Sequence, residues 1–373
     1  TGYGTNFKNV LDFGADPTGI ADSTVAFGLA IDAASVDKTM VYVPTGEYMI
    51  TSVLDNSTGP DFMGIVGDSA GESWINGSTL TTHALDFLNV PPFFRLENFK
   101  VSGPGQTSSP IVSSGIRLPV SGGIGVTLNV SIKNIEIRDF PTHGLYLQVP
   151  IVSVYENVTA VLIGEAGFYI DDTSGNGIGG TSTTFNNCYA NNVLEYGYYI
   201  KAHVYSTFNS CAADGCNDSY YLYQCAGIQM NGCGNEGNNF IDASRPGRGL
   251  VLDGCVGVSS NAHWCYFLPN VLSLGYDIIG GSAAITLIGA TNLDEGIVQT
   301  YDIHIGAAAG ICNFINCVAP NRISSIAALI NDEGGNNLTI FGAEVSPFAL
   351  SALSLVGSPL TTSVVLDAGW DTS

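Results

Sequence analysis

Three acidic residues recur at one position of a sequence repeat and could perform acid–base chemistry. Glu165, Glu195 and Asp218 each lie seven residues after a small apolar residue of the repeat. If successive repeats stack as neighbouring strands, adjacent carboxyl groups lie ~5 Å apart and alternate ones ~9.5 Å apart. Glycoside hydrolysis uses two carboxyls, at ~5 to 5.5 Å for retention and ~6.5 to 9.5 Å for inversion.

Stacked carboxylates repel one another, and the repulsion raises one pKa so that an acid stands beside an ionised base. We therefore predict that Glu165, Glu195 and Asp218 supply the acid and the base or nucleophile, without assigning which is which. The alternative is that they are solvated turn residues or bind a structural cation.

A second acidic column and a possible ion pair accompany these residues. Asp214 and Glu236 lie three residues after the Cys of their repeats and form the competing carboxylate pair. Asp171 and Lys201 share one phase of consecutive repeats, where a salt bridge between coils is the simplest interpretation. We expect all four to contact a substrate if the acids are catalytic.

Aromatic residues concentrate in the same part of the chain. Eleven of the 17 Tyr lie between Tyr146 and Tyr223. Alternate strand residues face inward, so some of these rings belong to the core. The outward ones, with His143 and His203, would line the face that carries the acids. Aromatic surfaces with polar neighbours suit sugars.

The elements that position these residues follow from a repeat of about 22 residues. A large apolar residue, two small polar residues and a Cys recur with Cys spacings of 23, 22 and 22, and once more later. The segments are Phe185–Cys188, Phe208–Cys211, Met230–Cys233, Leu252–Cys255 and Phe314–Cys317. This period predicts a solenoid of stacked coils with the Cys column in the core. Zinc sites use more closely spaced ligands, so we expect no metal.

A glycine marks a second strand in each repeat. Gly144, Gly167 and Gly197 each lie nine residues after the equivalent apolar position. The Gly-rich segment 173–180 lengthens one coil and would form a wall beside a groove. After about residue 270 the repeat loosens, so the C-terminal strands either continue the solenoid or form a separate sheet. We expect three regions, residues 1–55, 56–270 and 271–373.

The N-terminal sequence carries a recognisable signature. Residues 10–34 read VLDFGADPTGIADSTVAFGLAIDAA, and residues 41–50 read VYVPTGEYMI. They predict a short strand and turn, a helix from Thr24 to Ala34 capped at Asp22–Thr24, and two strands. The segment resembles the opening of pectate-lyase-type right-handed parallel β-helices, which include phage tailspikes, polysaccharide lyases, glycoside hydrolases and epimerases. The resemblance implies an all-β parallel β-helix with a short N-terminal capping helix.

Composition excludes several classes of protein. The net charge is −22, with 11 Lys and Arg against 33 Asp and Glu, and only 12% of residues are charged. We expect no nucleic-acid binding and no membrane insertion, because both favour basic or long apolar segments. The odd number of Cys, nine, predicts free buried thiols. The His spacing suggests no metal, and no cofactor motif is present.

The resemblance most favours a phage tailspike-like protein. It implies an endoglycosidase that hydrolyses a bacterial surface polysaccharide, a homotrimer and a location in the virion tail. The first alternative is a polysaccharide lyase using Lys201, His143 or His203 as base, and the second is a non-catalytic adhesin. The Asp-Pro-His motif of the related alginate epimerases is absent.

Overall fold

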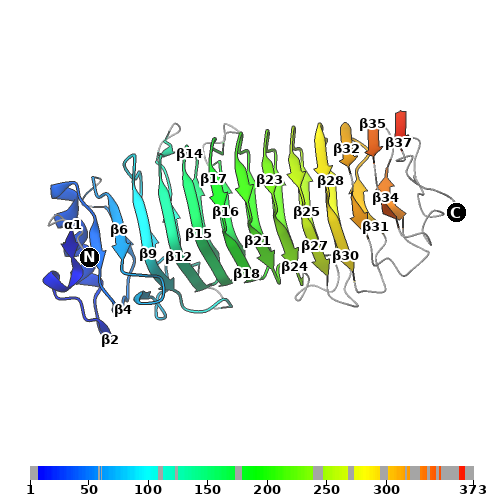
Figure 1. Ribbon diagram of the computed structural model, residues 1–373. Coiled ribbons are helices and arrows are strands. Elements are labelled where there is room, and N and C mark those ends of the chain that lie inside the picture. Colours follow the sequence, from blue (N-terminus) through cyan, green and yellow to red (C-terminus); the bar gives the residue numbers. More distant parts are fainter. Residues whose placement is uncertain are drawn as a thin grey trace. The chain divides into compact units, whose positions relative to one another are not determined.

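The protein folds as a parallel β-solenoid of about ten turns, and its described residues contain one short α-helix, near the N-terminus (Figure 1). The predicted all-β parallel β-helix is therefore confirmed. The computed structural model describes residues 7–365 except 58, 60, 108–111, 122–124, 173–178, 238–246, 268–272, 295–300, 316, 320–327, 334–336, 342–343 and 346–360. The chain divides into two compact units, residues 1–195 and 196–373.

The first unit contains the helices and three parallel sheets. The 3-10 helix η1 spans Val10–Phe13 and α1 spans Thr24–Asp37. One sheet contains β1 (Lys8–Asn9), β2 (Thr18–Asp22), β3 (Val41–Val43), β4 (Gly46–Met49), β6 (Gly64–Gly67), β7 (Ser73–Asn76), β9 (Arg95–Ser102), β12 (Ser131–Phe140), β15 (Val154–Ile163), β17 (Thr184–Asn186) and β18 (Tyr189–Val193). The second contains β5 (Leu54–Asp55), β8 (Leu85–Asp86), β10 (Ile116–Leu118), β13 (His143–Gln148) and β16 (Ala166–Asp171), and the third β11 (Thr127–Leu128) and β14 (Pro150–Ile151).

The N-terminal signature forms the predicted helix but not the first predicted strand. The side chain of Asn9 accepts a hydrogen bond from the Leu11 amide at 3.0 Å, and Gly14 is left-handed, so Val10–Phe13 winds into a 3-10 turn. Helix α1 buries Phe27 and packs against η1, β1, β3 and β5. At its start the Asp22 carboxylate accepts from the Thr24 amide at 2.9 Å.

The register of the first unit agrees with the predicted repeat. Ile135 of β12 pairs with Val158 of β15, and the Asn157 side chain donates to that of Asn134 across the coils at 3.0 Å. Gly144 is needed because an added Cβ would lie 2.7 Å from the Gly167 carbonyl oxygen. Small residues therefore let neighbouring coils approach at the start of the second strand.

The second unit contains further strands of the first and second of these sheets. One contains β20 (Thr207–Asn209), β21 (Ala212–Asp214), β23 (Gln229–Asn231), β24 (Gly234–Glu236), β26 (Ser259–Asn261), β27 (Trp264–Phe267), β29 (Ile285–Ile288), β30 (Thr291–Asp294), β32 (Ile311–Ile315), β33 (Val318–Ala319), β35 (Asn337–Phe341), β36 (Glu344–Val345) and β37 (Thr361–Val365). The other contains β19 (Tyr196–Lys201), β22 (Asp218–Tyr223), β25 (Gly247–Asp253), β28 (Ser273–Ile279), β31 (Tyr301–Ile305) and β34 (Ala328–Asp332). Two arrangements were predicted for the C-terminal strands, and the structure shows the first of them. These strands continue the solenoid, since β35 pairs in parallel with β32 and β37.

The Cys column holds in part. Asn209 pairs with Asn231, and Asn231 with Asn261, so His263 rather than Cys255 follows Cys233 in the column. Assigning Cys255 to it was wrong, because Leu252 and Asp253 belong to β25 of the other sheet. All nine Cys are buried free thiols, as predicted.

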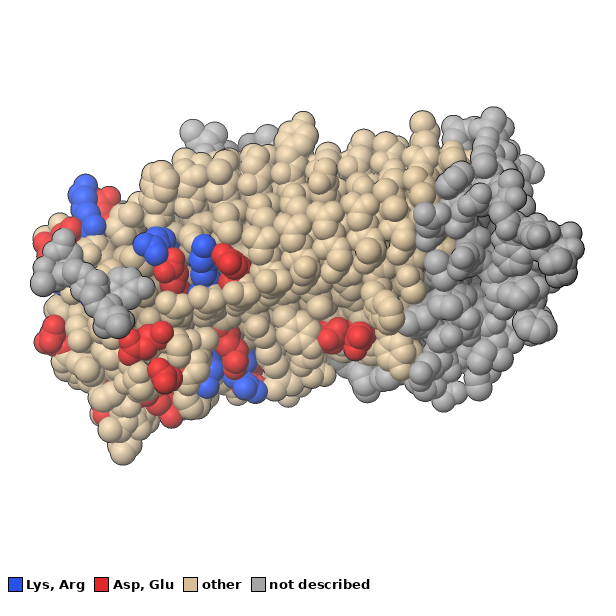
Figure 2. Space-filling view, viewed as in Figure 1, with Lys and Arg blue, Asp and Glu red and all other residues tan. Residues whose placement is uncertain are grey.

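The surface is poor in charge. On the face shown in Figure 2 the visible Lys and Arg gather over the first strands of the first unit, and most of the rest of that described face carries no charge. Most of the Gly-rich segment 173–180 lies outside the described residues. Within the described part of the chain, no helix has the length and apolar character required to cross a bilayer.

Candidate functional site

Glu165 and Glu195 follow paired strands and lie on neighbouring coils. Ile163 of β15 pairs with Val193 of β18, and each glutamate comes two residues later. Both side chains are exposed. Burial of part of the Glu165 side chain and the negative charge of Glu195 raise the pKa of Glu165 above its ordinary value. Glu165 is therefore the weaker acid beside a second carboxylate, which is the direction that an acid–base pair requires.

His143 connects this pair to an aromatic surface. Its ring stacks on Tyr169 at 4.2 Å between centroids, and its Nε2 lies 3.7 Å from a carboxylate oxygen of Glu165. Burial and the nearby Arg117 charge lower the pKa of His143 to about 3, so the imidazole is neutral at pH 7. Its Nδ1 is buried and has no hydrogen-bond partner among the described residues.

The aromatic surface continues along the outer side of the second sheet. Tyr146 pairs in register with Tyr169, and their rings stack at 5.5 Å. The Arg117 guanidinium lies 5.1 Å from the Tyr146 ring centroid and 3.1 Å from an oxygen of Asp86. We call Arg117, His143, Tyr146 and Tyr169 the tyrosine face. Its three rings stack on one another, with Tyr146 buried and His143 and Tyr169 half-buried. Arg117 approaches this stack at Tyr146, and Glu165 approaches it at His143.

The sequence did not identify Arg117 or single out a tyrosine of this face. The sequence around Arg117 lacks the Asn–Cys motif, so the phase of Arg117 could not be assigned. The one available signal was alternation, since Ile116 and Leu118 are apolar and Arg117 between them must face outward.

Asp218 does not share the phase of the other two acids. It pairs in register with Tyr196, one residue later than predicted, because the link from Cys211 to β22 is one residue shorter than that from Cys188 to β19. Its carboxylate is fully buried and receives two hydrogen bonds from Arg248, at 2.9 and 2.6 Å. Burial and this pairing favour a structural role over direct contact with a substrate.

Arg248 belongs to a line of charges in the second unit. Its other nitrogen lies 2.9 Å from Asp277, whose second oxygen lies 2.8 Å from His304, and His304 Nε2 lies 3.2 Å from Glu333. Burial raises the pKa of Asp277, but His304 and Arg248 outweigh it and lower this pKa below its ordinary value. The hydrogen bond to Asp277 raises the pKa of His304 despite partial burial. The arrangement is an alternating ion-pair network across neighbouring strands.

The predicted substrate-binding residues have different environments. Asp171 and Lys201 are half-buried at the ends of β16 and β19. His203 is fully buried, so its predicted position on the outer face was wrong. The preceding Ala202 is left-handed and turns the chain, which directs His203 inward.

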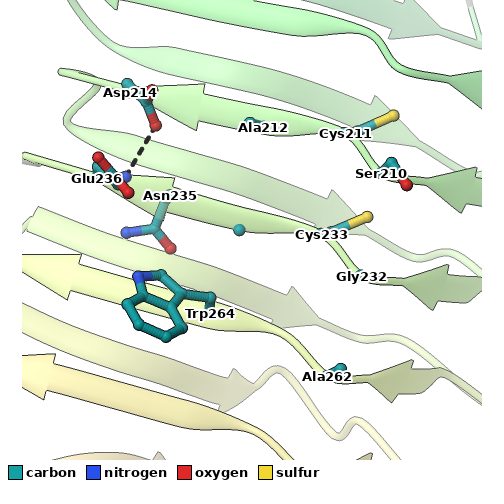
Figure 3. A pocket seen from close by; sticks show the side chains of 11 residues that line it. Ser210, Cys211, Ala212, Asp214, Gly232, Cys233, Asn235, Glu236, Ala262 and Trp264 are labelled. Carbon is teal, nitrogen blue, oxygen red and sulfur yellow. Dashed lines mark hydrogen bonds between the residues drawn. The ribbon is translucent and has the colours of Figure 1, made fainter.

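Asp214 and Glu236 pair in register, as predicted for the second acidic column. They lie at the edge of a shallow groove of about 400 Å³ that also includes Trp264 (Figure 3). Trp264 was missed because its strand follows Ser260–His263, which lacks the Cys of the motif. Among the described residues, no group of three or more His, Cys, Asp or Glu could bind a metal ion.

Solved structures with the same fold include enzymes and phage tail proteins. The catalytic unit of an α-1,3-glucanase from Streptomyces thermodiastaticus has a TM-score of 0.61 and 17% identity, covering 100% of this chain and 70% of that one. An Acinetobacter phage tailspike has a TM-score of 0.61 and 14% identity, covering 98% and 63%. The A-module of mannuronan C-5 epimerase AlgE6 from Azotobacter vinelandii has a TM-score of 0.58 and 20% identity, covering 96% and 98%.

Sequence comparison gives the family. Mannuronan C5-epimerase AlgE5 of Azotobacter vinelandii is 25% identical over 261 residues, which are 60% of this chain and 25% of that protein. The chain thus spans about a quarter of that relative's length. Residues 7–238, more than half of the chain, match the family described as rhamnogalacturonase A/epimerase, pectate lyase-like. The protein therefore belongs to the rhamnogalacturonase A/epimerase, pectate lyase-like family.

Proposed function

We propose that this protein is a polysaccharide-cleaving glycoside hydrolase that acts at the tyrosine face. The observation that carries the proposal is the raised pKa of Glu165 beside Glu195 on the next coil. Hydrolysis of a glycosidic bond needs a protonated acid and an ionised carboxylate on the two sides of that bond. Glu165 takes the part of the acid, and Glu195 that of the base or nucleophile.

The tyrosine face would hold the sugar next to this pair. The His143 and Tyr169 rings stack face to face, so they would border the sugar with the side of this stack and its polar atoms. The neutral His143 can hydrogen-bond a sugar hydroxyl without adding charge. Arg117 is oriented by its ion pair with Asp86. It can donate hydrogen bonds to oxygen atoms of a polysaccharide that extends along the sheet.

The experiment compares Glu165→Gln and Glu195→Gln with a matched control. Glu156→Gln changes a carboxylate on β15 that is paired with Lys133 at 3.0 Å. Release of reducing ends from a panel of bacterial capsular and O-antigen polysaccharides is measured. We call Glu165 and Glu195 the active pair. We expect each active-pair variant to lower kcat by about 100-fold or more and the control to retain wild-type activity. Wild-type activity in both active-pair variants would overturn the assignment.

A titration tests the same pair without requiring turnover. Carbon-13 NMR of the Glu165 carboxyl group should show a lower pKa in Glu195→Gln than in the wild type, because the neighbouring negative charge is gone. An unchanged Glu165 pKa would show that the two carboxyls do not interact.

A second candidate is lyase or epimerase chemistry on a uronic acid polymer. Arg117 could bind the uronate carboxylate, and the neutral His143 could remove the adjacent proton. The relation to mannuronan C5-epimerases also favours it. Absorbance near 235 nm during degradation would identify a lyase, and exchange of the C5 hydrogen with solvent without cleavage would identify an epimerase. The net charge of −22 disfavours polyanionic substrates and ranks this candidate second.

The biological setting we propose is the tail of a phage virion, with the protein as a homotrimer bound to a bacterial surface polysaccharide. The shared fold with an Acinetobacter phage tailspike supports this setting. A low-charge surface also fits contact between subunits. Sedimentation equilibrium would show three copies per particle. Binding of the glycan without cleavage or epimerisation would instead identify an adhesin.

A further inference from the structure

The groove at Trp264 exists because small residues occupy positions that are larger elsewhere. At the bend before the strand, the left-handed residue of the first unit's coils is Asn, at Asn98, Asn134, Asn157 and Asn187. In the second unit the same bend carries Ser210, Gly232 and Ala262. Ser and Ala adopt this conformation less readily than Asn, so the sequence departs from the more stable choice where the groove lies.

Small residues also adjoin Trp264 on the strands after the bend, where β24 and β27 approach closely. Ala212 of β21 pairs with Gly234 of β24, and Gly234 pairs with Trp264 of β27. A Cβ at Gly234 would lie 2.8 Å from the Trp264 carbonyl oxygen and 3.2 Å from its Cβ. Two nearly bare positions thus adjoin the indole, which is 45% exposed although Trp is a large apolar residue.

Carboxylates border the same hollow. Asp214 and Glu236 lie two residues beyond Ala212 and Gly234 on their strands, and the Glu236 amide donates to Asp214 at 2.9 Å. Figure 3 shows the indole, the small residues and both carboxylates around one space. A flat aromatic surface beside strong hydrogen-bond acceptors matches a pyranose, which has an apolar face and a rim of hydroxyl donors.

We propose that this groove binds one or two neutral pyranose residues of a polysaccharide as a non-catalytic site. The sugar face packs on Trp264, and its hydroxyls donate to Asp214 and Glu236. The two carboxylates disfavour anionic sugars, so the site selects neutral residues. It lies in the second unit and on a different sheet from the tyrosine face, and its binding does not depend on the proposed hydrolysis.

Tryptophan emission offers a direct assay, because the chain has three Trp. The probes are neutral hexasaccharides (maltohexaose, cellohexaose and laminarihexaose), with oligogalacturonate as the anionic comparison. Trp74→Phe is the matched control. The Lys100 ammonium lies 3.9 Å from the centroid of the Trp74 ring, and the Trp74 indole N–H donates to Ser102, so this ring is already occupied. We expect a neutral hexasaccharide to shift emission in the wild type and in Trp74→Phe.

Two variants locate the binding. Trp264→Leu should weaken the affinity measured by calorimetry at least about tenfold. Ala262→Asn places a larger side chain in the groove, where it should block the sugar. Because Asn tolerates the left-handed conformation of this bend, the variant should fold normally. Retention of reducing-end release from short substrates in both variants would separate this site from the active pair. Absence of binding to every neutral probe, equal binding of oligogalacturonate, or wild-type affinity in both variants would overturn the proposal.

Discussion

Removal of Arg248 should expose how strongly the second unit depends on its ion-pair network. Arg248 makes two hydrogen bonds to the fully buried Asp218 and one to Asp277. In Arg248→Met the Asp218 carboxylate loses this cation and stays in a site from which water is excluded. Breaking a buried pair by removing one partner costs about 3 to 5 kcal/mol. For a cooperative unit of this size, the loss lowers Tm by about 10 °C.

The same energy should largely return when both charges are removed. A buried ion pair replaced by apolar residues of similar volume is often neutral for stability. We therefore expect Asp218→Leu combined with Arg248→Met to be more stable than Arg248→Met alone. Urea unfolding of the two single variants and the double variant gives a coupling free energy, expected to be about 2 kcal/mol or more.

The variants are compared with the wild type at pH 7, where the effect of removing the Arg248 cation from beside the buried Asp218 is measured directly. A deficit under about 1 kcal/mol at pH 7, or additive effects in the double variant, would refute the reasoning.

Three further variants test buried groups. His263 is fully buried, neither ring nitrogen has a partner among the described residues, and burial lowers its pKa to about 3. We expect His263→Phe to raise the free energy of unfolding, measured in urea at pH 7, by about 1 kcal/mol. The variant should also lose less stability than the wild type between pH 6.5 and 3. A lower free energy of unfolding at pH 7 would contradict this reasoning. The raised pKa of His304 contributes stability that is complete below its unfolded pKa and lost as pH rises through the folded value. His304→Gln should remove that alkaline decline between pH 5 and 9, and an unchanged slope would exclude the bond to Asp277 as its cause. Gly144→Ala, whose Cβ would press on the Gly167 carbonyl, should cost about 1 to 3 kcal/mol, and an unchanged Tm would show that the coils separate freely.

The sequence predicted the fold wherever its repeat was regular. Phe185, Phe208 and Met230 with their Cys define a strand and bend of constant length, so stacking and burial followed from spacing alone. The assignment of Leu252 failed because the coil after Met230 is longer, and a similar motif falls on the other sheet. Local sequence cannot reveal which of two similar strands lies over a given partner when coil length changes.

The candidate site shows the same limit at the scale of one residue. Glu165 and Glu195 were placed together because the links before them are equal in length. Asp218 was predicted at the position of Glu195, but the link before it is one residue shorter. It therefore pairs with Tyr196, and its side chain is buried. A one-residue change in register alters which face a strand residue occupies. The partners of Asp218 come from coils whose phase the motif does not define.

The distribution of charge gives a consistent reason to favour a neutral glycan. Among the described residues, at least seven Lys and Arg form ion pairs with Asp or Glu. Each of these cations lies beside a carboxylate of the protein, so the described ion pairs leave little positive charge to attract a polyanion. Partial burial of Glu165 and the negative charge of Glu195 raise the pKa of Glu165, which is the condition that the proposed acid–base chemistry needs. A deficit of cations around such a pair keeps that pKa high, whereas a basic surface built to hold a uronate polymer would lower it.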